Sequence, residues 1–327
     1  MPSTDAAEAP VTDPGAADPA YAIETRSLTK VFGSQRAVDG IDLLVPRGSV
    51  YGFLGPNGSG KTTTIRMLLG LVTPTDGERR ILGEPLPAGL LPALQRVGSL
   101  IEGPAFHPYL SGRANLQRLD AADTRADAGT CGQRIDAALD RVGLTPAGGK
   151  KFRTYSLGMK QRLAIAAALL APRDLLVLDE PTNGLDPQGT REVRHLVASL
   201  AEEGITVLIS SHLLSEIQQI CSHIGVMRAG RLVAQGAIDD LRQSQTTRLT
   251  LTTPDTATAT KILEQQGVSH LEATGSQVTG RPGELRPEDL VAALVTAQVR
   301  VQAFAFERPS LEDYYVSLTG EGFAVRS

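Results

Sequence analysis

The sequence contains no tryptophan and few aromatic side chains of any kind, since Phe, Tyr and Trp together make up 4% of the residues. Cysteine is scarce as well, because Cys131 and Cys221 are the two cysteines of the sequence. A small secreted protein stabilised by disulfides would need more, so we expect a protein of a reducing compartment. Neither cysteine lies in a C-x-x-C pair or near two histidines at zinc-site spacing, which argues against a structural zinc ion.

A long hydrophobic run is also missing. The longest run, from Leu163 to Ala171, is about half of the roughly 20 residues that a membrane-spanning helix requires. Basic residues are not in excess either, because 32 Lys and Arg stand against 36 Asp and Glu, which gives a net charge of −4. We therefore expect a cytoplasmic protein that reaches a membrane through a partner, and we expect no nucleic acid partner.

The first 20 residues have neither the basic start nor the apolar centre of a signal peptide. They are rich in Ala, Pro and Asp, a composition typical of a disordered acidic tail. The remaining chain is long enough for two domains, and its composition changes near residue 244. We therefore expect one domain over residues 21–240 and an accessory domain over residues 245–327.

A glycine-rich segment fits the pattern G-x-x-x-x-G-K-[ST], which is typical of loops that bind nucleotide phosphates. An apolar run that predicts a buried strand, Val50–Leu54, precedes the segment, and a predicted helix, Thr63–Gly70, follows it. Lys61 would reach the β- and γ-phosphates of a nucleotide, and the Thr62 hydroxyl would bind Mg²⁺. The expected nucleotide-binding residues of this P-loop are Gly55, Pro56, Asn57, Gly58, Ser59, Gly60, Lys61, Thr62 and Thr63.

A second apolar run, Leu175–Leu178, ends in two carboxylates, Asp179 and Glu180. Beside a P-loop, Asp179 would contribute to the Mg²⁺ shell, and Glu180 would polarise the water that attacks the γ-phosphate. The alternative is that the two acids cap a loop or helix. The P-loop favours the catalytic interpretation.

Buried strands and helices alternate along residues 21–240, which predicts an α/β fold with a mostly parallel sheet. We expect two antiparallel strands over Ala22–Val45 and a small helical insert over about residues 103–155. Further elements predicted in this part are strands over Arg79–Gly83 and Thr206–Ile209 and helices over Leu163–Leu170 and Gly189–Glu203. The elements predicted beyond residue 245 indicate a small α+β domain: strand Arg248–Thr252, helix Ala257–Gln266, a hairpin around Gly275, helix Pro287–Ala297, strand Val299–Phe306 and a final helix.

Residues 155–162 resemble the signature motif of ABC ATPases, whose commonest form is Leu-Ser-Gly-Gly-Gln. The match keeps Ser156 and Gly158 and departs from that form at three other positions. Ser156 is also a good N-cap candidate, so a capped helix with no further role is the alternative. Exporter ATPases of the bacitracin, lantibiotic and daunorubicin type are similar in these departures. The resemblance extends over most of residues 22–236, and it implies the P-loop ABC ATPase fold.

The resemblance also implies roles for further residues. Phe32 lies where the family has an aromatic side chain that stacks on adenine, although a core Phe in an N-terminal strand is the alternative. Asp186 belongs to a loop expected to contact the opposite subunit, and His212 is expected to contact the γ-phosphate. Ser156 and Gly158 of a second copy would cover that phosphate, so the site would be complete in a head-to-tail dimer.

Glu102 stands where the family usually has a glutamine that contacts Mg²⁺ and senses the membrane partner. A carboxylate can also ligate Mg²⁺, but it adds negative charge near the phosphates. The segment that follows, Ala105–Leu110, is apolar and aromatic. Two interpretations remain open for it: a docking patch for a permease, or a cluster buried within the insert.

The resemblance implies an ATPase that uses ATP and Mg²⁺ and drives an ABC export transporter. It would work with a second copy of itself and a separately encoded permease, peripheral on the inner face of the cell membrane, with a drug or peptide antibiotic as cargo. The alternative is a soluble ABC ATPase that acts on the ribosome or DNA, although such proteins usually carry two ATPase units, a long coiled coil or a zinc module. A binding module that uses nucleotide as a clamp is a third hypothesis, and Glu180 and His212 argue against it.

Overall fold

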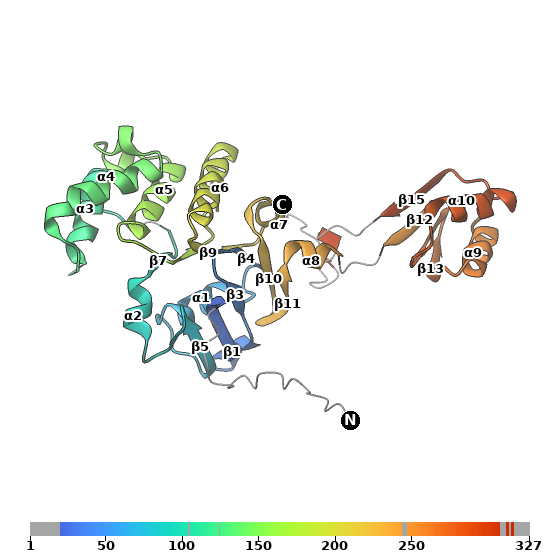
Figure 1. Cartoon of the computed structure of the whole chain (residues 1–327), viewed down its shortest axis with the longest axis horizontal. Helices are drawn as coiled ribbons and strands as arrows, with labels where there is room; N and C mark the ends of the chain where they lie inside the picture. The colour runs from blue at the N-terminus through green and yellow to red at the C-terminus, as the bar shows by residue number, and fades with distance from the viewer. Residues whose placement is uncertain are drawn as a thin grey trace, which may run out of the picture. The chain divides into compact units, whose positions relative to one another are not determined.

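The computed structural model describes residues 20–103, 105–123, 125–243, 247–307, 312–313 and 315–316. The chain divides into two compact units, one ending at Gln235 and the other starting at Gly236, and Figure 1 shows both. The expected acidic tail up to residue 19 and the start of the expected final helix lie outside the described residues. Among the described residues, no helix combines the length and the apolar character that crossing a bilayer requires.

A six-stranded sheet forms the centre of the first unit. Its strands, in spatial order, are β11 (Arg231–Ala237), β10 (His223–Arg228), β4 (Val50–Leu54), β9 (Thr206–Ser211), β8 (Leu175–Asp179) and β7 (Val97–Leu100). The strands from β10 to β7 run parallel to one another. Every residue of β4, β8 and β9 is buried, as expected for parallel strands covered on both faces. The prediction of a mostly parallel α/β sheet is confirmed.

A second, antiparallel sheet comes mainly from the N-terminal part of the chain. Its strands are β2 (Gln35–Ile41), β1 (Tyr21–Phe32), β5 (Asp76–Ile81) and β6 (Glu84–Pro85), with β3 (Leu44–Pro46) also paired to β1. The prediction of two strands over Ala22–Val45 is therefore incomplete, because β3 is a third. The strand predicted over Arg79–Gly83 is wrong at its end, because Leu82 and Gly83 have positive φ angles of 52° and 88° that leave the extended region.

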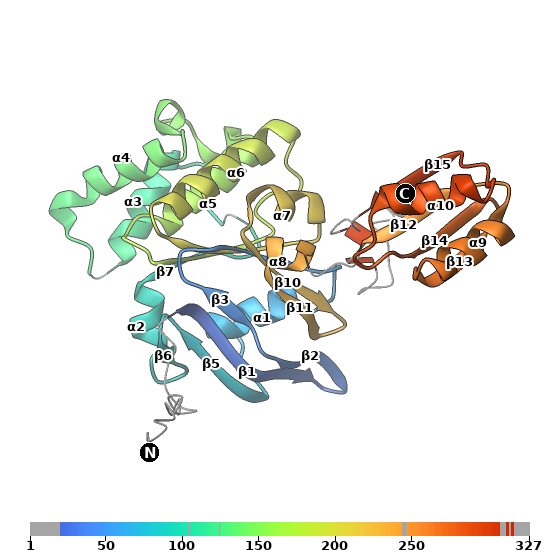
Figure 2. The same ribbon diagram turned by 45° about the vertical axis from the view of Figure 1, so that its right-hand side comes forward.

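Helices cover both faces of the parallel sheet (Figure 2). One of them, α1 (Lys61–Leu68), contacts β8 as well as β2 and β5, so it lies between the two sheets. The other face carries α5 (Leu157–Ala168), α6 (Pro187–Glu202) and α7 (Leu214–Ile220). A shorter helix, α2 (Leu90–Gln95), contacts β6 and β7. Both α5 and α6 begin before their predicted starts because the side chains of Ser156 and Asp186 cap them, each accepting a hydrogen bond from a backbone N–H three residues later.

The helical insert contains α3 (Gly112–Ala122) and α4 (Cys131–Arg141). Three short 3₁₀ helices accompany them: η1 (Ala128–Thr130), η2 (Thr145–Ala147) and η3 (Phe152–Thr154). Asp120 of α3 accepts two hydrogen bonds from the Arg134 guanidinium of α4, at 2.8 and 2.6 Å. Asp120 is 4% exposed, and this pairing holds the pKa of its carboxyl below the usual value. The pair therefore stabilises the contact between the two helices.

The second unit begins with α8 (Ile238–Gln243) and then builds a four-stranded sheet. Its further elements follow one another as β12 (Arg248–Thr252), α9 (Thr256–Gln265), β13 (Ser269–Thr274), β14 (Gln277–Arg281), α10 (Pro287–Thr296) and β15 (Ala303–Glu307). The sheet order β13-β14-β12-β15, with antiparallel neighbours, is the ferredoxin-like arrangement. The small α+β fold predicted for this part is confirmed. The strand predicted from Val299 starts later, because the N–H of Val299 bonds to the end of α10 and the N–H of Arg300 to Asp255.

Gly98 in β7 permits a close approach between this strand and α5. A Cβ atom at this position would lie 2.7 Å from the Ala168 carbonyl oxygen and 3.0 Å from Leu176 Cδ2. We expect Gly98→Ala to lower the free energy of unfolding by about 1–3 kcal/mol, because the strand and helix must move apart. Denaturant unfolding measures this loss.

Gly132→Ala in α4 is the matched control, because a Cβ atom there meets nothing within 4 Å. We expect this variant to keep the stability of the natural chain or to gain up to about 1 kcal/mol from better helix propensity. Equal unfolding midpoints for Gly98→Ala and the natural chain would show that the β7–α5 contact is not tight.

Candidate active site

Three neighbouring strands end at the same edge of the parallel sheet, and a predicted site residue follows the end of each. In the pairing of β4 with β9, Leu54 lies opposite Ser211. In the pairing of β9 with β8, Ser210 lies opposite Asp179. Since the strand ends are level, the loops that start at Gly55, Glu180 and His212 leave the sheet side by side, at the edge where open α/β sheets bind ligands.

The loop after β4 has a shape that its glycines permit. Gly58 and Gly60 have φ angles of 79° and 105°, a region that residues with a side chain occupy at a cost. At Gly60 a Cβ atom would also lie 2.6 Å from the Ala37 carbonyl oxygen. Helix α1 starts directly afterwards at Lys61. Because glycine has no side chain to cap it, the first N–H groups of α1 are available to an anion.

The Lys61 side chain turns back over its own loop. Its Nζ donates to the carbonyl oxygens of Gly55 at 2.6 Å and Pro56 at 3.2 Å, and it lies 3.7 Å from Glu180 Oε1. Burial lowers the pKa of this ammonium group, whereas the carboxylates of Glu180 and Asp179 raise it. Lys61 is thus a buried cation in contact with one of the two predicted carboxylates.

Ser210 at the end of β9 connects both acidic residues of the next strand. Its hydroxyl donates to Asp179 Oδ1 at 2.5 Å and accepts from the Glu180 N–H at 2.9 Å. Glu180 has a φ angle of 48°, which is unusual for a residue with a side chain and is common at functional sites. The Glu180 carboxylate then reaches His212, with 2.7 Å between Oε2 and Nδ1. The acid, the histidine and Lys61 therefore form one contiguous group.

Small-molecule sites have volumes of about 300–1,000 Å³. The described residues line a cavity of about 610 Å³ beside this group, which is in the range that suits a nucleotide. One part is lined by Glu180, Asn183 and six P-loop residues, Asn57, Gly58, Gly60, Lys61, Thr62 and Thr63, and the turn from β1 into β2 lines another. The predicted residues Gly55, Pro56, Ser59, Asp179 and His212 are not part of the lining. Phe32 in that turn is 49% exposed, with the Lys30 ammonium 4.8 Å from its ring centroid. An exposed ring at the cavity wall can stack on a nucleotide base. The alternative of a core Phe is excluded.

The family model described as ABC transporter matches residues 38–183. A relative, the bacitracin transport ATP-binding protein BcrA of Bacillus licheniformis, is 40% identical over 92% of this chain and 98% of its own length. The chain belongs to the ATP-binding subunits of ABC transporters. It is an ATPase, as predicted.

Two further comparisons agree with this membership. The daunorubicin/doxorubicin resistance ATP-binding protein DrrA of Streptomyces peucetius is 36% identical over 92% of this chain and 93% of its own length. Among solved structures, cbiO1 of Clostridium perfringens, part of the ABC transporter complex cbiONQ, is 28% identical. It covers 68% of this chain and 91% of its own, with a TM-score of 0.63. The predicted resemblance to bacitracin- and daunorubicin-type exporters and the predicted ABC ATPase fold are confirmed.

The ATP-binding subunit does not gather every predicted site residue around one cavity. The described residues Ser156, Gly158 and Asp186 are not among those that line it. Ser156 and Asp186 instead begin α5 and α6, where their side chains accept from the N–H groups of Met159 and Gly189. The P-loop, Glu180 and Phe32 thus form one group, and the two helix starts lie outside it.

Glu102 also lies outside the cavity lining. It follows β7 with a φ angle of 59°, its side chain is 65% exposed, and it forms an ion pair with Arg66. Arg66 is four residues after Thr62 on α1, so the two side chains lie on the same face of the helix. In this ATP-binding subunit, the charge that Glu102 introduces is therefore balanced by Arg66.

The donors predicted for Mg²⁺ are the Thr62 hydroxyl and the carboxylates of Asp179 and Glu102. Glu102 pairs with Arg66 outside the cavity lining, which leaves Thr62 and Asp179. No cluster of three His, Cys, Asp or Glu side chains able to hold a metal occurs among the described residues. A P-loop site does not need one, because phosphate oxygens and water complete a Mg²⁺ shell that begins with these two oxygen donors. Thr62 lines the cavity, and Asp179 is held by Ser210, so the donor chemistry fits.

Sequence reasoning missed two parts of this site. The first is Ser210, which lies two residues before His212 and bridges Asp179 and the Glu180 backbone. The available signal was the pair of serines that follows the apolar run 207–209. The second is the far wall of the cavity, where Arg36 and Gly230 come from separate turns. No local motif marks these residues, because the fold alone brings them to the nucleotide cavity.

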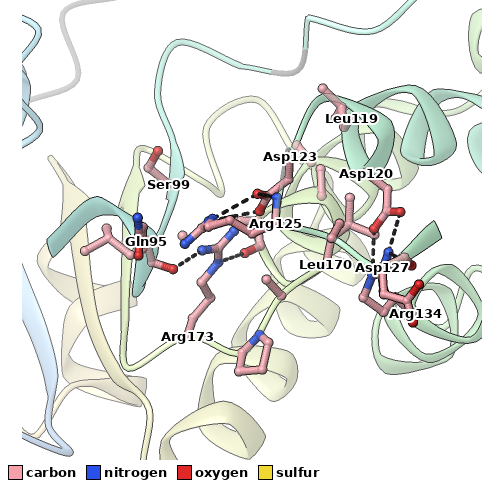
Figure 3. A pocket seen from close by; sticks show the side chains of 18 residues that line it. Gln95, Ser99, Leu119, Asp120, Asp123, Arg125, Asp127, Arg134, Leu170 and Arg173 are labelled. Atoms are coloured by element: carbon pink, nitrogen blue, oxygen red, sulfur yellow. Dashed lines mark hydrogen bonds and ion pairs between the residues drawn. The ribbon is translucent and has the colours of Figure 1, made fainter. Parts of the chain in front are cut away.

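A second cleft, of about 590 Å³, lies between the helical insert and the edge of the sheet (Figure 3). Its charged side chains are engaged with one another or with the backbone. Arg125 pairs with Asp123, Arg134 with Asp120, and Arg173 donates to the carbonyl oxygens of Gln95 and Ala168. The Arg134–Asp120 pair joins α3 to α4 within the insert, and Arg173 joins the end of α5 to the end of α2, just before β7.

We expect Ser210→Ala to lower the turnover number of the ATPase by roughly ten- to a hundredfold, because removal of a hydrogen bond to a charged group costs about 1.5–3 kcal/mol. Binding of ATP should change little, since the P-loop remains intact. Steady-state hydrolysis and nucleotide titration measure the two effects.

Ser222→Ala is the matched control. Ser222 is a serine that bonds to the Val50 carbonyl, before β10 and away from Asp179. We expect it to keep the natural turnover. Equal losses in both variants would mean that Ser210 acts through general stability of the sheet.

Proposed function

We propose that this chain is the ATP-hydrolysing subunit of an export transporter and that it works as a head-to-tail dimer with a separate membrane permease. The observation that carries the proposal is the split between two sets of site residues. Lys61 and His212 each contact Glu180 beside the P-loop cavity, whereas Ser156 and Gly158 begin a helix outside it. Each set is half of the ATP site that the family resemblance implies.

In the proposed mechanism, Lys61 binds the β- and γ-phosphates and the first N–H groups of α1 bind their oxygens. Thr62 and Asp179 would hold Mg²⁺, which when bound withdraws negative charge from these phosphates. Glu180 orients the attacking water and accepts its proton, while His212 fixes the Glu180 carboxylate and faces the γ-phosphate. Catalysis then depends on positioning and on electrostatic stabilisation.

A second copy would complete the site. Its Ser156 hydroxyl and Gly158 N–H, at the N-terminus of α5, suit contact with a phosphate because the helix start carries partial positive charge. Its Asp186 would contact the opposite subunit at the start of α6. Hydrolysis removes the anion that both copies share, so the pair can open.

The permease is the second proposed partner, and the segment after β7 is a candidate contact for it. Tyr109 is 63% exposed, with Arg153 above its ring. Phe106 instead packs against Phe152, with ring centroids 5.1 Å apart. The segment thus combines both earlier interpretations, a buried anchor and an exposed ring.

The cargo proposal comes from the relatives. One is a bacitracin transport protein and another a daunorubicin/doxorubicin resistance protein. We propose a drug or peptide antibiotic as cargo, with this subunit peripheral at the inner face of the cell membrane. Co-purification with a membrane protein encoded beside it supports the proposal, and co-sedimentation with ribosomes instead would contradict it.

We expect Lys61→Ala to abolish productive ATP binding, because it removes the buried cation that faces the phosphates. Titration with a fluorescent ATP analogue should show a loss of at least about a hundredfold in affinity, which corresponds to roughly 2.7 kcal/mol. Lys30→Ala, which removes a cation at the rim beside Phe32, should cost far less. Similar affinities for Lys61→Ala and the natural chain would refute the assignment.

We expect Glu180→Gln to bind ATP normally, to hydrolyse it at least about a hundredfold more slowly and to accumulate as an ATP-bound dimer, because general-base catalysis of this kind contributes roughly 10²–10⁴-fold. Size-exclusion chromatography with light scattering detects the dimer. Adding Ser156→Ala to this variant should weaken the dimer more than it weakens nucleotide binding by the monomer. Hydrolysis at the natural rate, or an ATP-bound species that stays monomeric, would count against the mechanism.

A further inference from the structure

Two loops carry the groups assigned to hydrolysis, and they leave adjacent strands. The loop after β8 runs from Glu180 to Asp186, and the loop after β9 contains His212. Contacts already described join the two strand ends through Ser210 and Asp179, and the first loop residues through His212 and Glu180. These contacts hold the catalytic groups, but they do not reach the part of the β8 loop after Glu180, which needs a further contact to position it.

Glu216, in the first turn of α7, provides a further connection between the loops. Its Oε2 accepts a hydrogen bond from Thr182 Oγ1 at 2.6 Å and one from Ser211 Oγ at 3.3 Å. Thr182 and Ser211 are 9% and 2% exposed. One carboxylate oxygen therefore holds a residue of the β8 loop and the last residue of β9, directly before His212, in a place where water competes little.

An acidic residue in the first helical turn is common, because it interacts favourably with the helix dipole. Glu216 differs from that general case. Its carboxylate accepts from hydroxyl groups of two other segments, and the same Ser211 hydroxyl oxygen accepts from the Leu213 N–H at 3.0 Å. The side chain thus connects the β8 loop, the end of β9 and the start of α7.

The helix that carries Glu216 is fixed to the strand that leads into the P-loop. Ile217 is fully buried, and a Cβ atom at Gly52 of β4 would lie 2.4 Å from Ile217 Cγ2. Such a close approach is possible because position 52 is glycine. Because α7 packs tightly against β4, Glu216 can position both loops relative to the P-loop.

We propose that Glu216 is a positioning residue that holds the loop 180–186 and His212 in a single arrangement relative to the bound ATP. It acts through Thr182 and Ser211 and touches neither ATP nor water at the reaction centre. The inference rests on the proposed function, because the position of the loop 180–186 affects hydrolysis when Asp186, at its end, faces a second copy. Loss of Glu216 should therefore disturb hydrolysis and leave ATP binding by the P-loop in place.

The test is steady-state hydrolysis by the purified full chain, with ATP binding measured separately. We expect Glu216→Ala to lower kcat about tenfold and to change KM and the affinity for ATP less than twofold. Glu216→Gln keeps an acceptor oxygen and should restore at least half of kcat. Thr182→Val should lose as much as Glu216→Ala, and the double variant should lose no more than either single variant, because both remove the same contact.

Gln219→Ala is the matched control on the same helix, since Gln219 contacts Arg194 of α6 and neither loop. It should keep the natural kcat. The proposal is overturned if Gln219→Ala loses as much as Glu216→Ala, if Glu216→Gln restores nothing, or if the losses of Glu216→Ala and Thr182→Val multiply in the double variant.

The Glu180→Gln chain separates this proposal from the function on which it rests. If Glu180→Gln forms no dimer with ATP, the proposed function fails whatever the Glu216 variants do. If it dimerises while Glu216→Ala hydrolyses ATP at the natural rate, the positioning role of Glu216 fails alone.

Discussion

The register between β4, β9 and β8 is the constraint on which the rest of the site depends. Because Leu54 lies opposite Ser211 and Asp179 opposite Ser210, the P-loop, the acidic pair and the histidine start at one level. A slip of one residue would turn each side chain to the other face of the sheet and would separate Ser210 from Asp179. Close packing opposes such a slip, because it would bring a side chain to the place where Gly52 of β4 leaves room for Ile217 of α7.

Charge balance is the second requirement, and it centres on Lys61. The ammonium group is buried, which by itself disfavours its charge, but the Glu180 and Asp179 carboxylates favour it. The backbone carbonyls of Gly55 and Pro56 satisfy its N–H donors at the same time. Lys61 can therefore keep its charge in a place where an approaching phosphate meets little competing water. The ion pair of Arg66 and Glu102 also balances charge. It stabilises the structure less than the contacts of Lys61, because it is exposed and solvent screens it.

The sequence predicted the parts of this protein whose chemistry is local. The P-loop strand, Val50–Leu54, and the first strand of the second unit, Arg248–Thr252, coincide with β4 and β12, because apolar runs bounded by turn residues carry their own signal. Strand ends failed where a long-range contact decides them, as at Val299, where the end of α10 and Asp255 hold the chain. Ser210 and Glu216 were missed as site residues for the same reason, since the sequence does not show which groups they contact. Their partners lie 31 and 34 residues away in sequence, and the parallel sheet brings them together.

The capping geometry of α5 bears on the proposed role of a second copy. Ser156 accepts a hydrogen bond from the Met159 N–H through its hydroxyl oxygen, and a hydroxyl that accepts one bond can still donate its own proton. A phosphate from the opposite subunit would need such a donor, together with the partial positive charge of the helix start. Gly158 leaves room for this approach, because even a Cβ atom there would meet its nearest neighbour, Gly189 Cα, at 3.6 Å. The same bond that starts α5 therefore orients the Ser156 oxygen and leaves its proton for the shared ATP, which explains how a capping serine can be both structural and catalytic in the proposed dimer.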